Sequence, residues 1–347
     1  MRQKSERGRG LVLIFLVSAI ALFATVGRAA EEPQRTRPTI GFKLSGGIGL
    51  ALNGGGDLET YRQGMIDLYH DVGTIDYFTG VNNWKKMVTI PNFELDLIFH
   101  LNERVGIGIG TGYLQATSQG DYGFVFDQAG SESWGTYTLS ATTSNVEDFK
   151  ISAIPIRLSL YLTFPSGRWT TYGYAGAGFY LGKFSHKYTY DFKYNYADSS
   201  TIYLDEKQEI TSSDVSDESA KKNSFGFHGG LGLEYRLGSF LSLGLELFGR
   251  FVNFSGWEGD AKMTSSSRQK DWREDSGWYF DQSMTDTQST KGKLWYYESQ
   301  DLDLGKYYPQ LNMWGAPSGS TSRNARDAAI NLNAFGLAVT VRVFFNL

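Results

Sequence analysis

The stretch "LAVTVRVFFNL" (residues 337–347) alternates between two kinds of side chain. Every odd position is apolar, whereas the even positions include Thr340, Arg342 and Asn346. A period of two is typical of a β-strand whose two faces differ. A soluble antiparallel sheet shows this pattern when one face packs on a core and the other meets water. The stretch therefore predicts a strand, and the fold depends on what keeps its apolar face dry.

Seven further segments alternate in the same way: 39–52, 92–102, 105–113, 151–164, 169–182, 224–237 and 240–251. With the last strand they make eight, each long enough to cross a bilayer at a tilt, which takes about 9 to 11 residues. Their connections alternate between short ones (102–104, 165–168 and around Gly238) and long ones (53–91, 117–150, 185–223 and 253–329). This pattern predicts an all-β fold, an eight-stranded antiparallel transmembrane β-barrel with four long extracellular loops.

Composition agrees with an all-β chain. The 347 residues include 41 Gly, only 7 Pro and no Cys, and 15% of them are aromatic. Glycine and aromatic residues in place of long helix formers favour strands. Beyond the N-terminal region no run of 18 consecutive apolar residues occurs, so membrane crossing by helices is not predicted.

The N-terminus carries a targeting pattern. Basic residues precede an apolar or small-residue run over 11–26, which is followed by "GRAA" and Glu31. The pattern predicts a secretory signal peptide over 1–30 and a barrel over 31–347. The alternative is an N-terminal membrane anchor, but the run is shorter than the roughly 20 residues that span a bilayer. Without residues 1–30 the chain has 28 basic and 36 acidic residues, a net charge of −8, which speaks against a nucleic-acid partner.

The faces opposite the apolar ones carry charges of both signs. A narrow eight-stranded lumen has room for side chains only, and isolated ions there are costly, so these charges are expected to pair and close the bore. Lipid would then cover the apolar faces. The alternative, a soluble lipocalin-type barrel, would bury its apolar face inside. The predicted lumen network is Lys43, Glu94, Asp96, Arg157, Glu234, Arg236, Glu246, Arg250 and Arg342.

On these residues the sequence resembles the small bacterial outer-membrane β-barrel superfamily, which includes the outer membrane protein A-type eight-stranded barrels. In that superfamily the last strand has alternating apolar residues and an aromatic end, which the barrel assembly machinery reads. Val339, Val341, Val343 and Phe345 fit this assembly signal, although the final residue is Leu347. The resemblance implies a place in the outer membrane of a Gram-negative cell. Outer-membrane lipid, lipopolysaccharide and, during biogenesis, the assembly machinery would be partners.

Three functions remain open. The first is a structural or surface-binding role through the long extracellular loops, and the second is a transporter or pore for small or hydrophobic solutes. The third is an outer-membrane lipid-modifying enzyme, but the four histidines stand in no catalytic motif: His100 and His228 have inward parity, while His70 and His186 lie in predicted loops. We therefore expect no enzyme, no cofactor and no metal site.

Two long loops have features of their own. Residues 57–73 predict a helix with Asp57 as N-cap and Gly73 as its end, interrupted by Gly64. Exposed aromatic residues can stack on sugars or anchor a protein, so the last loop suggests a glycan or protein ligand. The alternative is that these side chains form the core of the loop itself. Its tryptophans, five of eight in the chain, are Trp257, Trp272, Trp278, Trp295 and Trp314.

Overall fold

The computed structural model describes residues 39–74, 78–132, 135–200 and 204–346. The predicted signal peptide and Leu347 lie outside these residues. The elements are β1 (Thr39–Ala51), the 3-10 helix η1 (Leu52–Gly55), α2 (Asp57–Val72), β2 (Phe78–Lys85), β3 (Thr89–His100), β4 (Val105–Glu132), β5 (Gly135–Ser166), β6 (Trp169–Ser200), β7 (Glu206–Arg236), β8 (Leu241–Ser255), β9 (Glu258–Arg273), β10 (Gly277–Lys293), β11 (Trp295–Gln300), β12 (Tyr307–Asn312), β13 (Ser322–Asp327), β14 (Ala329–Asn331) and β15 (Ala334–Asn346). The predicted all-β class is confirmed.

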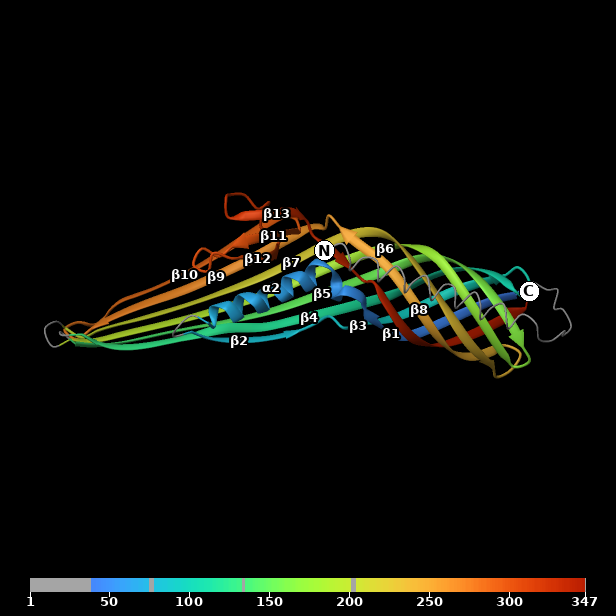
Figure 1. The fold of residues 1–347 in the computed structure, drawn as a ribbon, viewed down its shortest axis with the longest axis horizontal. Coiled ribbons are helices and arrows are strands. Elements are labelled where there is room, and N and C mark those ends of the chain that lie inside the picture. Colours follow the sequence, from blue (N-terminus) through green and yellow to red (C-terminus); the bar gives the residue numbers. More distant parts are fainter. Residues whose placement is uncertain (1–38, 75–77, 133–134, 201–203, 347) are drawn as a thin grey trace.

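Eight strands pair into a closed antiparallel ring, in the order β1, β3, β4, β5, β6, β7, β8 and β15. The seam that closes it joins β15 to β1, with Thr39 opposite Asn346 and Ala51 opposite Ala334. Figure 1 shows the ring at one end of an elongated molecule. Closure satisfies the backbone groups of both seam strands, so the ring has no edge.

The outer surface of the ring is apolar. Every ring strand contributes exposed large apolar side chains at alternate positions, among them Leu44, Leu95, Ile109, Leu158, Phe179, Phe227, Leu245 and Val339. We call this surface the apolar band. Among the described residues, no helix has the length and apolar character needed to cross a membrane.

The prediction of eight strands joined by four long loops needs correction. The described residues form fifteen strands, and two of the predicted loops, 117–150 and 185–223, are largely continuous strand. β5 and β6 each have 32 residues, a length of about 105 Å at 3.3 Å per residue. The bilayer core is only about 30 Å thick, so these strands extend far beyond the ring. On β6 the alternation continues beyond the ring, with aromatic residues in place of aliphatic ones on one face, whereas the corresponding part of β7 is polar on both faces.

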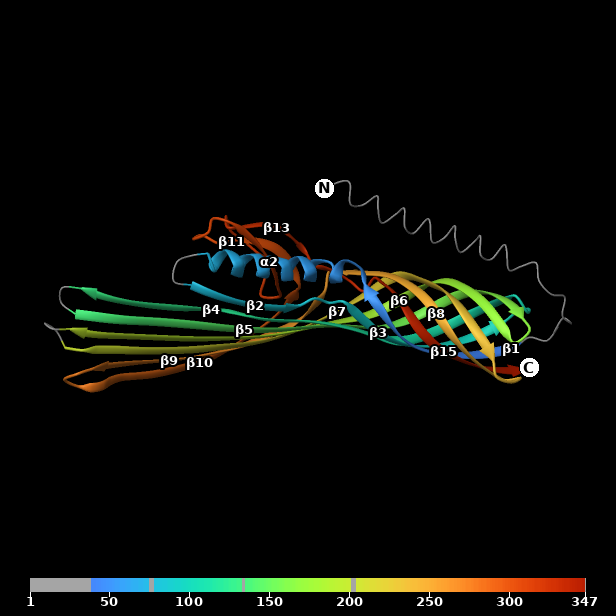
Figure 2. The same ribbon diagram turned by 60° about the horizontal axis from the view of Figure 1, so that its bottom comes forward.

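We call this projection the stalk. It comprises residues 115–132, 135–152, 183–200 and 206–221 of β4 to β7, together with β2, β9 and β10. Residues 206–221 of β7 pair with β9, and residues 226–236 pair with β8. The ring opens into the stalk between these two parts of β7. The stalk is an open sheet in the order β2, β4, β5, β6, β7, β9 and β10. Figure 2 shows it projecting away from the ring.

One face of the stalk is covered by a cap, which we define as α2 and the three-stranded sheet β12-β11-β13. The N-cap of α2 is Gly56 and not Asp57 as predicted. The Asp57 carboxylate instead accepts hydrogen bonds from Arg326 Nη2 at 2.6 Å and from the Ala329 amide at 2.7 Å. A Cβ on Gly64 would overlap the ring of Pro309 on β12. The mid-helix glycine therefore lets β12 pack directly on α2.

Candidate functional site

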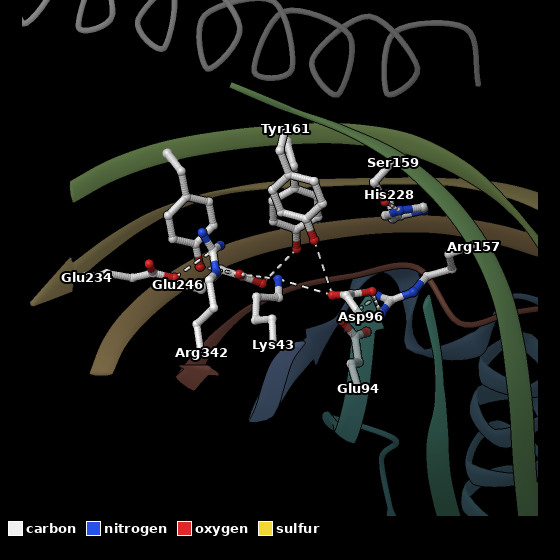
Figure 3. A network of polar contacts seen from close by, with 12 residues as sticks. Lys43, Glu94, Asp96, Arg157, Ser159, Tyr161, His228, Glu234, Glu246 and Arg342 are labelled. Atoms are coloured by element: carbon white, nitrogen blue, oxygen red, sulfur yellow. Dashed lines mark hydrogen bonds and ion pairs between the residues drawn. The ribbon is translucent and has the colours of Figure 1, made fainter. Parts of the chain in front are cut away.

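A charged network fills the bore of the ring. Arg157 lies between Glu94 and Asp96, with its Nη2 2.7 Å from Asp96 Oδ1. Lys43 Nζ lies 3.3 Å from Asp96 Oδ2 and 2.8 Å from Glu246 Oε2. At the other end Arg250 Nη2 lies 2.8 Å from Glu94 Oε1. Six side chains thus form one chain of alternating charge, shown in part in Figure 3.

A second pair and three tyrosines complete the network. Arg342 Nη2 lies 3.1 Å from Glu234 Oε1. Tyr172 and Tyr174 donate to the two oxygens of Glu246 at 2.6 and 2.7 Å, and Tyr161 donates to Asp96 at 3.2 Å. The eight charged residues, four basic and four acidic, are each 3% exposed or less. Balanced pairing with added hydrogen bonds is the arrangement that buried ions require.

Eight of the nine residues proposed for the lumen are therefore brought together, and Arg236 is the exception. Its guanidinium is half-buried and lies 5.8 Å from the ring centroid of Phe344. Arg236 lies at the end of β7 beside the short turn to β8. Arg236 has the inward parity that the sequence predicts. It lies at the last position of β7, however, and so does not reach the carboxylates of the network.

Two histidines also lie inside the ring. His228 Nε2 is 2.7 Å from Ser159 Oγ, and both side chains are buried. His100 is buried near Arg342, with its ring centroid 6.2 Å from that of Phe344. The described residues hold no group of three or more His, Asp or Glu side chains that could bind a metal ion.

Above the charged network the interior becomes apolar. On β5 the inward positions continue from Arg157 to Ala153, Ile151 and Phe149, all of them buried. These side chains belong to one cluster with Leu58 of the cap, and with residues of β8, β14 and the segments around β11 and β12. The mouth of the ring is thus filled by a hydrophobic core between the ring and the cap.

A second polar cluster follows on the same inner face, in the stalk. His186 on β6 lies between two carboxylates: its Nδ1 is 3.1 Å from Glu218 Oε2 on β7, and its Nε2 is 3.3 Å from Glu147 Oε2 on β5. The imidazole stacks on Phe149 at 4.2 Å with an interplanar angle of 4°. Tyr61 of α2 donates to Glu147 Oε1 at 2.7 Å. We call His186, Glu147 and Glu218 the latch, because they join the cap to the stalk.

The latch residues reinforce one another electrostatically. Burial by itself would lower the pKa of His186, but its hydrogen bonds to Glu147 and Glu218 outweigh burial and raise the pKa to about 9. Burial and the Glu147 charge raise the pKa of Tyr61 well above its ordinary value, so its hydroxyl stays a donor. Tyr122 also donates to Glu147, and the Met313 amide, which follows β12, donates to Glu218 at 3.4 Å. At neutral pH a cationic imidazole therefore bridges two carboxylates.

The latch was missed because His186 was assigned to a loop. A signal did exist: even-numbered positions of β6 carry Tyr180, Phe184, His186 and Tyr188, in phase with the strand below. The partners Glu147 and Glu218 lie 39 and 32 residues away along the chain. Only the strand pairing brings Glu218 opposite His186 and Glu147 next to it, opposite Tyr188.

Further out, the inner face of the stalk carries a row of half-buried aromatic side chains that we call the aromatic ladder: Tyr190, Phe192, Tyr194 and Tyr196 of β6. Neighbouring strands place Thr143 and Ser212 on either side of Phe192 and Gln208 beside Tyr196, whereas Ile210 lies beside Tyr194 and Leu139 is the other neighbour of Tyr196. Successive rungs are about 6.6 Å apart along the strand. The ladder is a partly exposed row of aromatic rings with both polar and apolar side chains beside it.

The five tryptophans proposed as a binding group do not form one surface. Trp257 is fully buried in the core at the mouth of the ring, and Trp314 packs against that core. Trp272 and Trp278 face each other across β9 and β10, beside Lys207 and Lys270 respectively. Trp295, on β11, is half-buried. The prediction of an exposed binding side chain is therefore wrong for Trp257, which is fully buried, while Trp314 is partly buried against the same core.

The strand proposed as an assembly signal is β15. Val339 and Phe345 are exposed on the apolar band, and Val341 and Val343 are partly exposed on the same face. The Phe345 ring meets that of Phe42 on β1 edge-on at 5.6 Å. The signal residues thus line the outer side of the seam that closes the ring.

A family model described as outer membrane protein beta-barrel domain matches residues 16–266 of the chain. No curated protein matches the chain. Among solved structures, a FadL homologue from Pseudomonas aeruginosa aligns over 89% of this chain and 90% of its own at 9% identity, with a TM-score of 0.16. The siderophore receptor PirA from Pseudomonas aeruginosa aligns over 90% and 81% at 6% identity, with a TM-score of 0.09. The unliganded ferric citrate transporter FecA aligns over 90% and 79% at 7% identity, also with a TM-score of 0.09. Scores this low carry no argument on fold or function.

Proposed function

Since the chain belongs to the outer membrane protein beta-barrel domain family and lies in the bacterial outer membrane, we propose that its eight-stranded ring is a closed membrane anchor for a surface-binding stalk. The observation that carries this proposal is the filling of the bore. The charged network occupies the ring, and the apolar core closes the mouth above it. We propose no catalytic role for the charged network or for the apolar core.

The direction of the stalk follows from the connections. Short turns join β3 to β4, β5 to β6 and β7 to β8 at the end of the ring opposite the stalk. Outer-membrane barrels have short periplasmic turns and long extracellular connections. The stalk is therefore extracellular in our proposal. Residues 135–152 of β5 would reach about 60 Å beyond the ring.

The aromatic ladder supports a binding role and favours a sugar-type ligand. Tyrosine offers an apolar ring face together with a polar hydroxyl, and the neighbouring Thr143, Ser212 and Gln208 supply donors and acceptors. A purely hydrophobic partner would leave these polar groups unpaired, which costs free energy. A polyhydroxylated ligand pairs with both kinds of group.

The test uses the detergent-folded protein on an array of bacterial and host glycans. We expect binding that falls by at least ten-fold in the variant Tyr194→Ala with Tyr196→Ala. The matched control is Asn195→Ala, which lies between these two tyrosines on the opposite face of β6 and should bind like the parent. Equal glycan binding by all three proteins, or no binding by the parent, would show that the aromatic ladder is not a sugar-binding site.

The closed anchor has its own test. Incorporated into planar bilayers, the parent protein should show no steady conductance, because the network and core leave no water path. A parent protein that conducts in regular steps, or that admits small solutes into vesicles, would favour a transport function over a closed anchor.

A further inference from the structure

Two lysines face each other on the outer surface where the ring opens into the stalk. Lys183 of β6 is the direct cross-strand partner of Lys221 of β7, and both are exposed. Like charges directly opposite each other destabilise a sheet. Lys150 of β5 belongs to the same surface, since its partner Ser185 is two positions from Lys183 on β6. We call these three residues the lysine cluster.

Acidic neighbours do not neutralise this cluster. None of the ion pairs formed by the described residues includes Lys150, Lys183 or Lys221. Glu258 of β9 is opposite Lys221, and Lys293 of β10, opposite Glu258 on its other side, pairs with Asp327 at 3.6 Å, so Glu258 is the one carboxylate directly opposite the lysine pair. The cluster therefore keeps a net positive charge on a chain whose overall charge is negative.

Lys187 provides a contrast on the same strand and face. Its cross-strand partners are Asp148 on β5 and Asp217 on β7. One strand thus carries a lysine between two acids and, four positions nearer the ring, a lysine opposite another lysine. The uncompensated charge is confined to the level next to the membrane.

The height of the cluster is set by the apolar band. On β6 the outward positions run from Phe179 to Leu181 and then Lys183. On β5 Ile156 and Ile154 precede Ser152 and Lys150 in the same direction. Outward side chains two positions apart are about 6.6 Å apart along a strand. The ammonium groups thus lie just past the last exposed apolar side chains, at the depth of lipid headgroups.

The ring strands β4 and β8 carry no charge at this level. Outward positions above the apolar band hold Gln115 and Thr117 on β4, and Asn253 and Ser255 on β8. If the membrane surface required only polar side chains, uncharged residues such as these would suffice on every strand of the ring. Among the ring strands, the lysines at this level lie on β5, β6 and β7.

We propose that the lysine cluster binds the phosphorylated headgroup of a lipid in the outer leaflet, with the acyl chains of that lipid lying on the exposed side chains of β5, β6 and β7. Ammonium groups donate charge-assisted hydrogen bonds to phosphate oxygens. A phosphate bound between Lys183 and Lys221 attracts both ammonium groups and so offsets the repulsion between them. The inference needs the ring to lie in the membrane and does not depend on the aromatic ladder, so each can fail without the other.

The test is native mass spectrometry of the detergent-folded protein with bisphosphorylated lipid A. Lys183→Gln should weaken lipid A binding about five-fold, and Lys183→Gln with Lys221→Gln about thirty-fold, as expected for two lysines at a charged membrane surface. Lys187→Gln, which changes charge equally on the same strand, should bind like the parent. Dephosphorylated lipid A should bind parent and double variant equally.

Three results would overturn the proposal. The first is equal loss in Lys187→Gln and Lys183→Gln, which would indicate only general charge attraction. The second is unchanged binding in the double variant. The third is displacement of bound lipid A by an equal concentration of inorganic phosphate, which would indicate a site for the free anion. All of these side chains are exposed, so a heat-modifiability gel should show every variant folded.

Discussion

Arg157 Nη2 lies 2.7 Å from Asp96 Oδ1, and both side chains are buried within the ring. Arg157 also binds Glu94, which in turn binds Arg250, while Asp96 binds Lys43. The central charges, Glu94, Arg157 and Asp96, each have two partners of opposite charge. Removal of a central member therefore affects groups on β3, β5 and β8 together.

Arg157→Ala should leave Glu94 and Asp96 short of positive charge, and loss of one partner from a buried pair costs roughly 3 to 5 kcal/mol. We expect a lower denaturant midpoint and brief conductance events in planar bilayers. The matched control is Arg236→Ala, which removes an arginine outside the network and should change neither measurement. Equal destabilisation by both substitutions would show that the network does not hold the ring closed.

The latch predicts a pH dependence of cap attachment. The pKa of His186 in the folded protein, about 9, lies above its ordinary value of 6.5. Its stabilisation is therefore fully present below pH 6.5 and is lost as the pH rises through 9. The protection factor of the α2 amides, which corrects for the base catalysis of exchange, should be high at pH 7 and lower at pH 10 in the parent.

His186→Gln should have low protection factors in α2 at both pH values, because it lacks the cation between Glu147 and Glu218. His70→Gln, at an exposed histidine of the same cap, should behave like the parent. A parent whose α2 has equal protection factors at pH 7 and pH 10 would contradict the assignment of a charged imidazole.

Gly64→Ala tests the packing of α2 on β12. Alanine normally stabilises a helix relative to glycine by about 1 kcal/mol. Here the added Cβ would overlap Pro309, so we expect the substitution to loosen β12 and to speed its hydrogen exchange. Pro309→Ala in the same chain should restore part of the protection. Gln63→Ala, one position away, should have no such effect, and protection equal to the parent in Gly64→Ala would refute the close packing.

The direction of the stalk predicts which tags reach the cell surface. Asp275 lies in the exposed turn between β9 and β10, and Gly238 lies in the short turn between β7 and β8. A peptide tag at Asp275 should bind antibody on intact cells, whereas one at Gly238 should need permeabilised cells. Detection in the reverse pattern would invert the orientation.

Much of the ring could be predicted because its strands combine two strict patterns. Outward residues such as Leu158 are aliphatic and inward ones such as Arg157 are charged or small, so parity assigns each side chain to a face. The stalk offers no such contrast. On β7, Ser212 and Ser213 point to opposite faces, and nothing in their chemistry distinguishes a strand from a polar loop. The pairing of β7 with β9 joins residues as far apart as Glu206 and Arg273, and no local pattern encodes such a register.

The seam between β1 and β15 sets an order of events during biogenesis. Its strands lie at opposite ends of the described chain, with Thr39 opposite Asn346, and every residue of the stalk and cap lies between them. The seam cannot form until β15 has been delivered. Until then both seam strands have unpaired edges, which are prone to pair with other chains. In the orientation that we propose, the stalk is secreted before the ring is sealed, and whatever protects the two strand edges until then must leave room for a long polar sheet to pass beside them.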